Sequence, residues 1–263
     1  MDLKLKGKRA FISGSTQGIG FAIAQQLIKE GVDVTINGRH KLRTEKSKEK
    51  LQEQFPNANI SAISADFSKK EEVEELLTQL EDIDILVNNV GIFDVKDFGS
   101  IVDEDWYQYF EINVMSSVRL SRQLLPKMLN KEWGRVIFIS SESGVNIPEN
   151  MIHYGMTKSA MSAIANGLSK LTKGTEVTVN TILGGPTYSH GVAEVIEQIA
   201  RAQDLDIEEM KTAILQQSNP HMLLQRFIDP SEIANLVSYI SSPISLATNG
   251  ASLRADSGVL KTI

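Results

Sequence analysis

The sequence contains no cysteine, and this absence excludes several kinds of chemistry together. Without a thiol, the chain forms no disulfide, holds no thiolate-bound metal and has no cysteine nucleophile. Histidine is scarce too: there are four, with no paired spacing typical of metal ligands, so no metal site is expected. A chain without disulfides is compatible with a reducing cytosol.

Long apolar runs and an excess of positive charge are missing as well. No run approaches the roughly 18 apolar residues of a membrane helix, and the opening Met1–Lys6 lacks the apolar core of a secretory signal. The 27 Lys and Arg against 33 Asp and Glu leave a net charge of −6, whereas a nucleic-acid-binding surface is expected to be basic. The charged stretch Lys41–Glu53 mixes both signs, which indicates a solvated helix face. We therefore expect a soluble, cytoplasmic protein that binds neither membrane nor nucleic acid.

What the sequence does contain is an alternation of strand-like and helix-like segments. Its 263 residues, 41% of them hydrophobic, suit one large domain over residues 1–263. The predicted strands are Arg9–Ser13, Asp33–Asn37, Ile60–Ser64, Ile83–Asn88, Val136–Ser140, Val177–Leu183 and Ala251–Ala255. The predicted helices are Gly18–Glu30, Lys41–Gln54, Lys70–Leu80, Asp103–Asn130, Asn150–Lys173, His190–Gln217 and Pro230–Ser241. This pattern predicts an α/β fold of the doubly wound, Rossmann type, in which a seven-stranded, mostly parallel sheet has helices on both faces.

A glycine-rich turn follows the first predicted strand. It reads Ser13-Gly14-Ser15-Thr16-Gln17-Gly18-Ile19-Gly20 and leads directly into a predicted helix. Glycines here let the backbone approach a diphosphate closely, and the N–H groups at the helix start can receive its negative charge. The spacing is Gly-x-x-x-Gly-x-Gly, which differs from the commoner dinucleotide fold, and glycines in a turn can also be purely structural. The order of strand, turn and helix favours a phosphate cradle.

The second predicted strand ends at Asn37-Gly38-Arg39-His40-Lys41, with no acidic residue. In dinucleotide folds this point faces the adenosine ribose, where an acid favours a free 2′-hydroxyl. Arg39 can instead pair with a 2′-phosphate, because a guanidinium matches phosphate oxygens. The sequence therefore predicts NADP as the cofactor, with NAD as the alternative if Arg39 is a solvated loop residue.

Tyr154 and Lys158 lie one helical turn apart near the start of a predicted helix. Residues at this spacing share a face, so the phenol and the ammonium can act together. A tyrosine pKa near 10 is too high for efficient proton exchange at neutral pH, and a nearby cation stabilises the phenolate. Ser141 follows the predicted strand Val136–Ser140, at the edge of the sheet where functional groups gather. It is well placed to bind a carbonyl oxygen.

With these residues assembled, the chain resembles the short-chain dehydrogenase/reductase family, and in particular members like the 3-oxoacyl-carrier-protein reductases. The resemblance spans nearly the whole chain. Asn88-Asn89-Val90-Gly91 resembles the family's Asn-Asn-Ala-Gly, and Asp66 resembles its adenine-contacting acid. Asn113, in Glu111-Ile112-Asn113-Val114, matches the asparagine of a catalytic tetrad. The other members of that tetrad are Ser141, Tyr154 and Lys158.

The resemblance implies an oxidoreductase that transfers hydride between a nicotinamide and a carbonyl or an alcohol. Tyr154 would be the general acid/base and Ser141 would polarise the substrate oxygen. Lys158 would lower the tyrosine pKa and hold the nicotinamide ribose, and Asn113 would hold a water in the proton relay. The implied cofactor-binding residues are Gly14, Ser15, Thr16, Gln17, Gly18, Ile19, Gly20, Arg39, Asp66, Asn89, Gly91, Tyr154, Lys158 and Thr187. The family also implies a homo-oligomer, either a dimer or a tetramer.

The chain departs from the family pattern at three places. Gly184 stands in Leu183-Gly184-Gly185-Pro186-Thr187 where proline is usual, Asp256-Ser257-Gly258 replaces Asp-Gly-Gly, and Val90 replaces alanine. Two alternatives stay open: an acyl thioester on a carrier protein as the substrate, or a catalytically silent nucleotide-binding regulator or scaffold. The intact tetrad counts against the second. His153 adjoins Tyr154, but helix neighbours one apart do not face each other, so it need not enter the site.

The segment Thr187–Phe227 is predicted to be a substrate lid. It is too long for a simple connection, and long excursions in compact domains are usually functional. Apolar residues recur at three- and four-residue intervals in both of its halves. These apolar faces can close over a substrate or bury against the body of the domain. Gly184 and Gly185 at its base are the predicted hinge.

Overall fold

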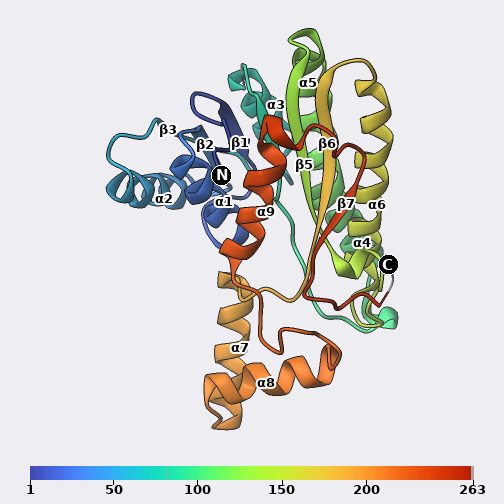
Figure 1. The fold of residues 1–263 in the computed structure, drawn as a ribbon. Helices are drawn as coiled ribbons and strands as arrows, with labels where there is room; N and C mark the ends of the chain where they lie inside the picture. Colours follow the sequence, from blue (N-terminus) through green and yellow to red (C-terminus); the bar gives the residue numbers. More distant parts are fainter. Residues whose placement is uncertain (81, 262–263) are drawn as a thin grey trace.

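The computed structural model describes residues 1–80 and 82–261, and Figure 1 shows a twisted sheet between two helical layers. Within these residues the sheet has seven strands in the order β3-β2-β1-β4-β5-β6-β7, and every neighbouring pair is parallel. The strands are β1 (Arg9–Ile12), β2 (Asp33–Gly38), β3 (Ile60–Ser64), β4 (Ile85–Asn88), β5 (Trp133–Ser141), β6 (Glu176–Gly184) and β7 (Ser252–Ala255). The predicted doubly wound α/β fold is confirmed.

Side chains of the central strands pack into two separate hydrophobic cores, one on each face of the sheet, because successive residues point to opposite faces. In β1, Ala10 and Ile12 belong to one core and Phe11 to the other. The first core is covered by α1 (Gly18–Lys29), α2 (Lys41–Gln54) and α9 (Pro230–Ser241). The second is covered by α3 (Lys70–Gln79), α5 (Ser116–Asn130) and α6 (Ile152–Ser169). Burial on both faces explains why valine and isoleucine occupy successive strand positions.

The strand order reverses between β1 and β4. From β1 the chain builds outward through β2 to β3, and it then returns to the other side of β1 with β4. In open parallel sheets, such a reversal leaves a crevice outside the carboxyl ends of the two strands, where ligands bind. The turn after β1 and the loop after β4 both lie at this crevice.

Two predicted helices are interrupted in the structure. The helix expected over 103–130 is α4 (Asp103–Tyr109), a π-helical turn at Phe110–Met115, and α5. The single helix expected over 190–217 is wrong. Asp204 adopts a left-handed conformation with φ of 53° that ends α7 (His190–Gln203), and the side chain of Asp206 caps α8 (Ile207–Ser218) by accepting from Glu208 N at 2.8 Å.

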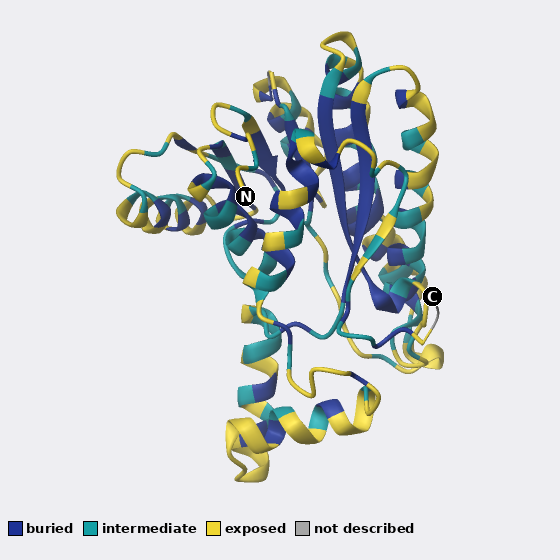
Figure 2. Cartoon of the chain, viewed as in Figure 1, coloured by how far each residue is buried: buried dark blue, intermediate teal, exposed yellow. Residues whose placement is uncertain are grey.

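Helices α7 and α8 form an arm that projects from the body below the carboxyl edge of the sheet (Figure 1). Ile196 and Ala200 of α7 pack against Met210 of α8, so the two apolar faces largely bury each other. The surface of the arm is mostly exposed or partly exposed, in contrast to the buried central strands (Figure 2). The arm thus has a small core of its own.

Gly184 and Gly185, at the base of this arm, are held in the sheet. Gly184 is paired with Ser141 on one side and with Ala255 on the other. Gly185 N donates to Ala255 O at 3.1 Å, and a Cβ on Gly185 would lie 2.7 Å from Asp256 Cα. Close approach of two backbones, and not freedom to bend, therefore accounts for Gly185.

We expect Gly185→Ala to destabilise the protein, because the added methyl meets backbone atoms that cannot move aside. Overpacking of this kind costs about 1–3 kcal/mol. Urea unfolding measures the loss. Gly167→Ala is the control: Gly167 lies in α6, where a Cβ would meet no other part of the chain within 4 Å, and alanine there should add about 0.5–1 kcal/mol. Equal stabilities for the two variants would contradict the close-packing explanation.

Candidate active site

The turn between β1 and α1 has the shape of an anion cradle. Gly14 and Gly18 have φ of 62° and 58°, a left-handed conformation that favours glycine. A Cβ on Gly20 would lie 2.5 Å from Gly14 O and from the Asn89 side-chain nitrogen. The turn is therefore closed tightly against its neighbours, with the N-terminus of α1 at its edge. Such a terminus carries unpaired N–H groups and partial positive charge, which suits a diphosphate.

Side chains beneath the turn hold it in place. Asn89 Nδ2 donates to Ser13 O at 3.0 Å and to Gly14 O at 2.8 Å. Ser13 Oγ accepts from Asn89 N at 2.9 Å. Ser15, predicted to bind the cofactor, is fully buried: its hydroxyl donates to Ile12 O at 2.7 Å and its N–H donates to Asn37 O at 2.8 Å. With both groups committed within the protein, Ser15 supports the turn from below and has no donor left for a ligand.

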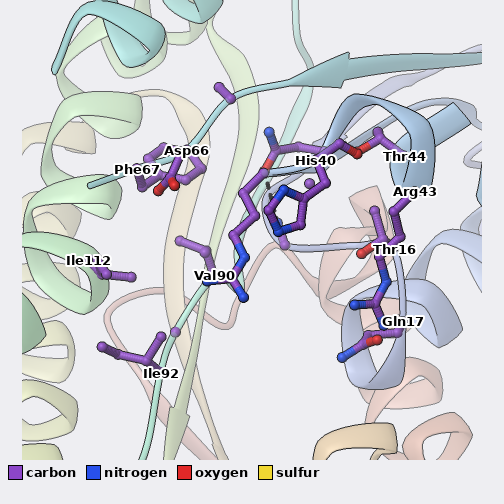
Figure 3. Close-up of a pocket in the computed structure, with 16 residues that line it drawn as sticks. Thr16, Gln17, His40, Arg43, Thr44, Asp66, Phe67, Val90, Ile92 and Ile112 are labelled. Carbon is purple, nitrogen blue, oxygen red and sulfur yellow. Dashed lines mark hydrogen bonds between the residues drawn. The ribbon is translucent and has the colours of Figure 1, made fainter. Parts of the chain in front are cut away.

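A cleft opens beside this turn, at the carboxyl ends of β1, β2, β3 and β4 (Figure 3). Its lining brings together six of the predicted cofactor residues: Gly14, Thr16, Gln17, Arg39, Asp66 and Gly91. Gly91 lines the same cleft from the loop after β4. Buried Gln17 Oε1 has no hydrogen-bond partner among the described residues, so one acceptor is available to a ligand. The shape, glycine turn and free polar atom fit a dinucleotide.

Basic side chains line the end of the cleft beside α2. Besides Arg39, His40 and Arg43 line it, and Figure 3 shows Arg43 beside Thr16 and Gln17. Arg43 was not among the predicted cofactor residues, because it lies in the mixed-charge stretch 41–53. The available signal was its position four residues after Arg39, in the first turn of the helix that follows β2.

Asp66 follows β3 and stays ionised at the opposite wall of the cleft. Burial raises the pKa of its carboxyl, but hydrogen bonds from Ser68 and the charges of Lys69 and Arg39 outweigh that effect, so the pKa lies below its usual range. Ser68 N donates to Asp66 Oδ1 at 3.0 Å, and Ser68 Oγ donates to the same atom at 2.8 Å. Asp66 can therefore accept further hydrogen bonds at neutral pH.

The four predicted catalytic residues come from three different elements. Ser141 ends β5, Tyr154 and Lys158 lie in the first turns of α6, and Asn113 lies in the π-helical turn between α4 and α5. A π-helical turn inside an α-helix is often found at a functional site, because it redirects one side chain. Asn113 Oδ1 accepts from Ile92 N at 2.8 Å, and its amide nitrogen donates to Ile92 O at 3.0 Å.

Gly91 marks the point where this group meets the cofactor cleft. A Cβ on Gly91 would lie 3.5 Å from Asn113 Oδ1 and 3.6 Å from Lys158 Nζ. Lys158 Nζ also donates to Ile139 O at 2.9 Å and lies 5.5 Å from the centre of the Tyr154 ring. The structure therefore places the lysine between the tyrosine and the floor of the cleft.

Burial dominates the proton affinities here. It raises the pKa of Tyr154, with a further increase from the charge of Glu142 and an opposing effect of a hydrogen bond between Tyr154 and Ser141. Burial also lowers the pKa of Lys158 to about 8, against the attraction of Glu142. The lowering of the tyrosine pKa that was expected from Lys158 is not seen in this structure, where burial raises that pKa. A phenol that keeps its proton at neutral pH suits a general acid.

Glu142 is a site residue that the sequence analysis did not single out. Its side chain is buried beside Ser141, and it accepts hydrogen bonds from the hydroxyls of Ser141 and Ser143. The signal was Ser141-Glu142-Ser143 at the carboxyl end of a buried strand, since an acid there cannot be solvated freely.

His153 faces away from this group, as its spacing from Tyr154 predicted. Its ring is buried against α4, 4.2 Å from the ring centre of Tyr109 and 6.2 Å from that of Trp106. Burial lowers the pKa of its imidazole, with opposing charge from Asp105 and Asp94. His153 therefore contributes packing between α4 and α6.

Thr187 lies where the chain leaves the sheet for the arm. Its hydroxyl donates to Gly185 O at 2.8 Å, and the residue bridges to Ile228 on the returning segment. Ser189, two residues on, lies beside the glycine turn, because a Cβ on Gly18 would be 3.4 Å from Ser189 Cβ. The base of the arm and the cradle are in contact.

The fold and this arrangement define a class, a parallel α/β oxidoreductase with a dinucleotide cleft. The family model for short chain dehydrogenase matches residues 8–200, so the chain belongs to the short chain dehydrogenase family. It is 40% identical over 263 residues to the uncharacterized oxidoreductase YvaG of Bacillus subtilis, with all of both chains covered. It is 27% identical to a 3-oxoacyl-[acyl-carrier-protein] reductase of Aquifex aeolicus, over 98% of this chain and 100% of that one.

A solved structure agrees over the full length. The L-sorbose reductase of Gluconobacter frateurii, complexed with NADPH and L-sorbose, superposes with a TM-score of 0.93 at 28% identity, and all of both chains is covered. The chain is accordingly an oxidoreductase of the short chain dehydrogenase family. None of the helices in the described residues is both long enough and apolar enough to cross a membrane.

Proposed function

We propose that this enzyme uses NADP(H) to transfer hydride between the nicotinamide and a carbonyl or alcohol, with Tyr154 as the general acid/base. The observation that carries the proposal is the convergence of Asn113, Tyr154 and Lys158 beside Gly91, where the cofactor cleft ends. A bound nicotinamide supplies the hydride chemistry. The protein supplies the proton and the position of the substrate oxygen.

Each member of the group has a distinct part in this proposal. Tyr154 gives its phenolic proton to the substrate oxygen during reduction, and Ser141 hydrogen-bonds the same oxygen. Lys158 compensates the negative charge left on the phenolate and holds the nicotinamide ribose. Asn113 is rigidly held by Ile92 and Thr157, which suits the orientation of a water in a proton relay. No feature of the described site favours the silent-regulator alternative.

The preference for NADP(H) rests on two guanidinium groups at the ribose end of the cleft. Arg39 and Arg43 both line it, and no acid follows β2 to accept a free 2′-hydroxyl. Arg39 lies just before α2 and Arg43 lies in its first turn, so both can pair with one phosphate, which is stronger than a single contact. The similarity to a reductase solved with NADPH supports the same choice.

For the substrate, we propose a small neutral ketone or the corresponding alcohol. The match to L-sorbose reductase supports a hydroxylated ketone. An acyl thioester on a carrier protein is the alternative, since a 3-oxoacyl-carrier-protein reductase is also related. NADPH oxidation with a panel of ketones, hydroxyketones and 3-oxoacyl thioesters distinguishes the two.

The segment Thr187–Phe227 acts as the lid in this proposal. It is anchored at its base, where Tyr188 N donates to Ile228 O at 2.9 Å, and at its far end, where Leu223 N donates to Ser257 O at 2.8 Å. Between these anchors α7 and α8 pack mainly on each other, so they can move as one unit. Since Gly184 and Gly185 are fixed in the sheet, we place the bending points beyond Thr187 and in the loop after α8. Closure would exclude water from the reaction.

We further propose a cytoplasmic enzyme that assembles as a dimer or tetramer. The absence of cysteine suits a reducing compartment. The assembly is an expectation from family resemblance, and light scattering of the purified protein measures it.

Tyr154→Phe removes only the phenolic oxygen and keeps the ring in place. NADPH binding should survive, whereas turnover should fall at least about 10²–10⁴-fold, because that is the usual contribution of general acid/base catalysis. Fluorescence titration measures the first effect and steady-state rates measure the second. A variant that keeps half of the wild-type kcat would contradict the assignment.

Arg39→Ala and Arg43→Ala should each weaken NADPH binding and leave NADH binding nearly unchanged. A hydrogen bond to a charged group contributes about 1.5–3 kcal/mol, so each loss should raise the Kd for NADPH roughly ten- to hundred-fold. Lys48→Ala is the matched control, because it removes a positive charge from α2, the helix that carries Arg43, at a position outside the cleft lining. If the wild-type enzyme binds both cofactors equally, the preference is refuted.

The lid predicts a pattern of hydrogen exchange. Amides of α7 and α8 should exchange faster than those of β5 and β6 in the free enzyme, and should slow when NADPH and a substrate analogue bind together. Exchange mass spectrometry resolves these segments. If the amides of α7 and α8 exchange as slowly as those of β5 and β6 and no ligand changes their rates, the segment does not move and is not a lid.

A further inference from the structure

A buried carboxyl adjoins the serine that is proposed to bind the substrate oxygen. Glu142 is 9% exposed and lies directly after Ser141 at the end of β5. The Ser141 hydroxyl donates to Glu142 Oε2, the Ser143 hydroxyl donates to Oε1 at 3.1 Å, and Ser143 N donates to Ser141 Oγ at 3.1 Å. Neither the cofactor cleft nor the general acid explains why a carboxyl lies at this point.

Other titratable groups face the Glu142 carboxyl from two sides. From α6, Tyr154 and Lys158 interact electrostatically with Glu142. From the loop after β7, Asp256 faces it, and Asp256 is itself paired with Arg254 at 3.0 Å. Glu142 therefore lies between one cation and one anion, with its nearest hydrogen bonds supplied by the two serines.

The protonation state of Glu142 determines which hydrogen bond Ser141 can offer a ligand. A hydroxyl has one proton and two acceptor lone pairs. When Glu142 is ionised, the serine proton is committed to the carboxylate, so Ser141 has only a lone pair to offer a ligand. When Glu142 is protonated, its O–H and the Ser143 N–H fill both lone pairs, and the serine proton is free to point at a ligand.

A carbonyl oxygen and an alcohol require opposite partners. The carbonyl oxygen only accepts, so it needs a donor, whereas an alcohol can also donate into a lone pair. We propose that Glu142 is a positioning residue whose protonation sets the direction of the Ser141 hydrogen bond, so that Ser141 donates to a substrate carbonyl only while Glu142 carries a proton. This inference rests on the role assigned to Ser141 in the proposed function.

The direction of the Glu142 pKa supports this role. Burial raises it above the ordinary value, although hydrogen bonds from Ser141 and Ser143 oppose the increase, and the charge of Asp256 raises it further. The carboxyl therefore keeps its proton to a higher pH than a solvated glutamate does. Carbonyl reduction is favoured below the Glu142 pKa and declines as the pH rises through it.

The test is the pH profile of kcat/KM for ketone reduction by NADPH. The wild-type profile should fall at least about tenfold on its alkaline side, before Tyr154 itself ionises. Glu142→Gln and Glu142→Ala should both remove this decline, because neither side chain can hold the serine proton as a carboxylate. Ser143→Ala should keep the decline but move it to higher pH, since one hydrogen bond that stabilises the ionised carboxyl is lost. A decline caused by Lys158, whose pKa is about 8, would instead persist in the Glu142 variants and move to lower pH, because the charge of Glu142 raises the Lys158 pKa.

A binding measurement tests the same idea without turnover. The product alcohol should inhibit the enzyme–NADPH complex more strongly as Glu142 ionises, in the opposite direction to ketone binding. In Glu142→Gln this pH dependence should disappear. Melting temperature and NADPH titration show whether each variant is folded, and Ser143→Ala gives an independent result if both Glu142 variants are not.

Ser141→Ala distinguishes a failure of the role proposed for Ser141 from a failure of the role proposed for Glu142. If Ser141→Ala reduces ketones at the wild-type rate, the proposed role of the serine is wrong. If Ser141→Ala is inactive but Glu142→Gln and Glu142→Ala keep the wild-type alkaline decline, the proposed function stands and the role of Glu142 is overturned.

Discussion

The side-chain amide of Asn89 joins the two loops on which the cofactor cleft depends. It donates to both Ser13 O and Gly14 O, and so locks the turn after β1 against the loop after β4. A Cβ on Gly14 would lie 2.9 Å from Val90 Cα, so the two backbones are already at contact distance. Since β1 and β4 flank the reversal in strand order, this contact sets the geometry of the crevice between them. The glycine cradle and the loop that carries Gly91 take their positions from it.

The catalytic group sets three ionisable side chains in one buried region. The charge of Glu142 raises the pKa of both Tyr154 and Lys158, and in all three side chains burial is the largest cause of the pKa shift. Low dielectric strengthens every interaction among them, so a change of charge on one is felt by the others. A lysine whose pKa is near 8 and a tyrosine that holds its proton are consequences of the same enclosure. Enclosure is therefore as much a part of this site as the identity of its residues.

The sequence predicted the architecture well because the architecture depends on local patterns. Strands buried on both faces require valine and isoleucine at successive positions, and helices between them require one apolar stripe, so both can be read along the chain. The helix expected over 190–217 failed because its break depends on one left-handed residue, Asp204, and aspartate adopts that conformation only in context. The π-helical turn at Phe110–Met115 was not predicted either, because no residue type marks a π-helical turn within a helix.

By itself, the sequence determined the fold class and the glycine turn, because each depends on spacing within one element or on a motif at its end. Resemblance to a family then singled out Asn113, Ser141, Tyr154 and Lys158 as a predicted group. The tertiary structure alone decided that Ser15 supports the turn from below and that Arg43 enters the cleft. It also decided that the Glu142 carboxyl holds the Ser141 hydroxyl, and that Gly185 is needed for contact with Asp256. These facts depend on which segments, distant in the chain, come to lie against each other. Burial and close approach arise only when the sheet and its helices have packed together, and so local spacing in the sequence does not predict them.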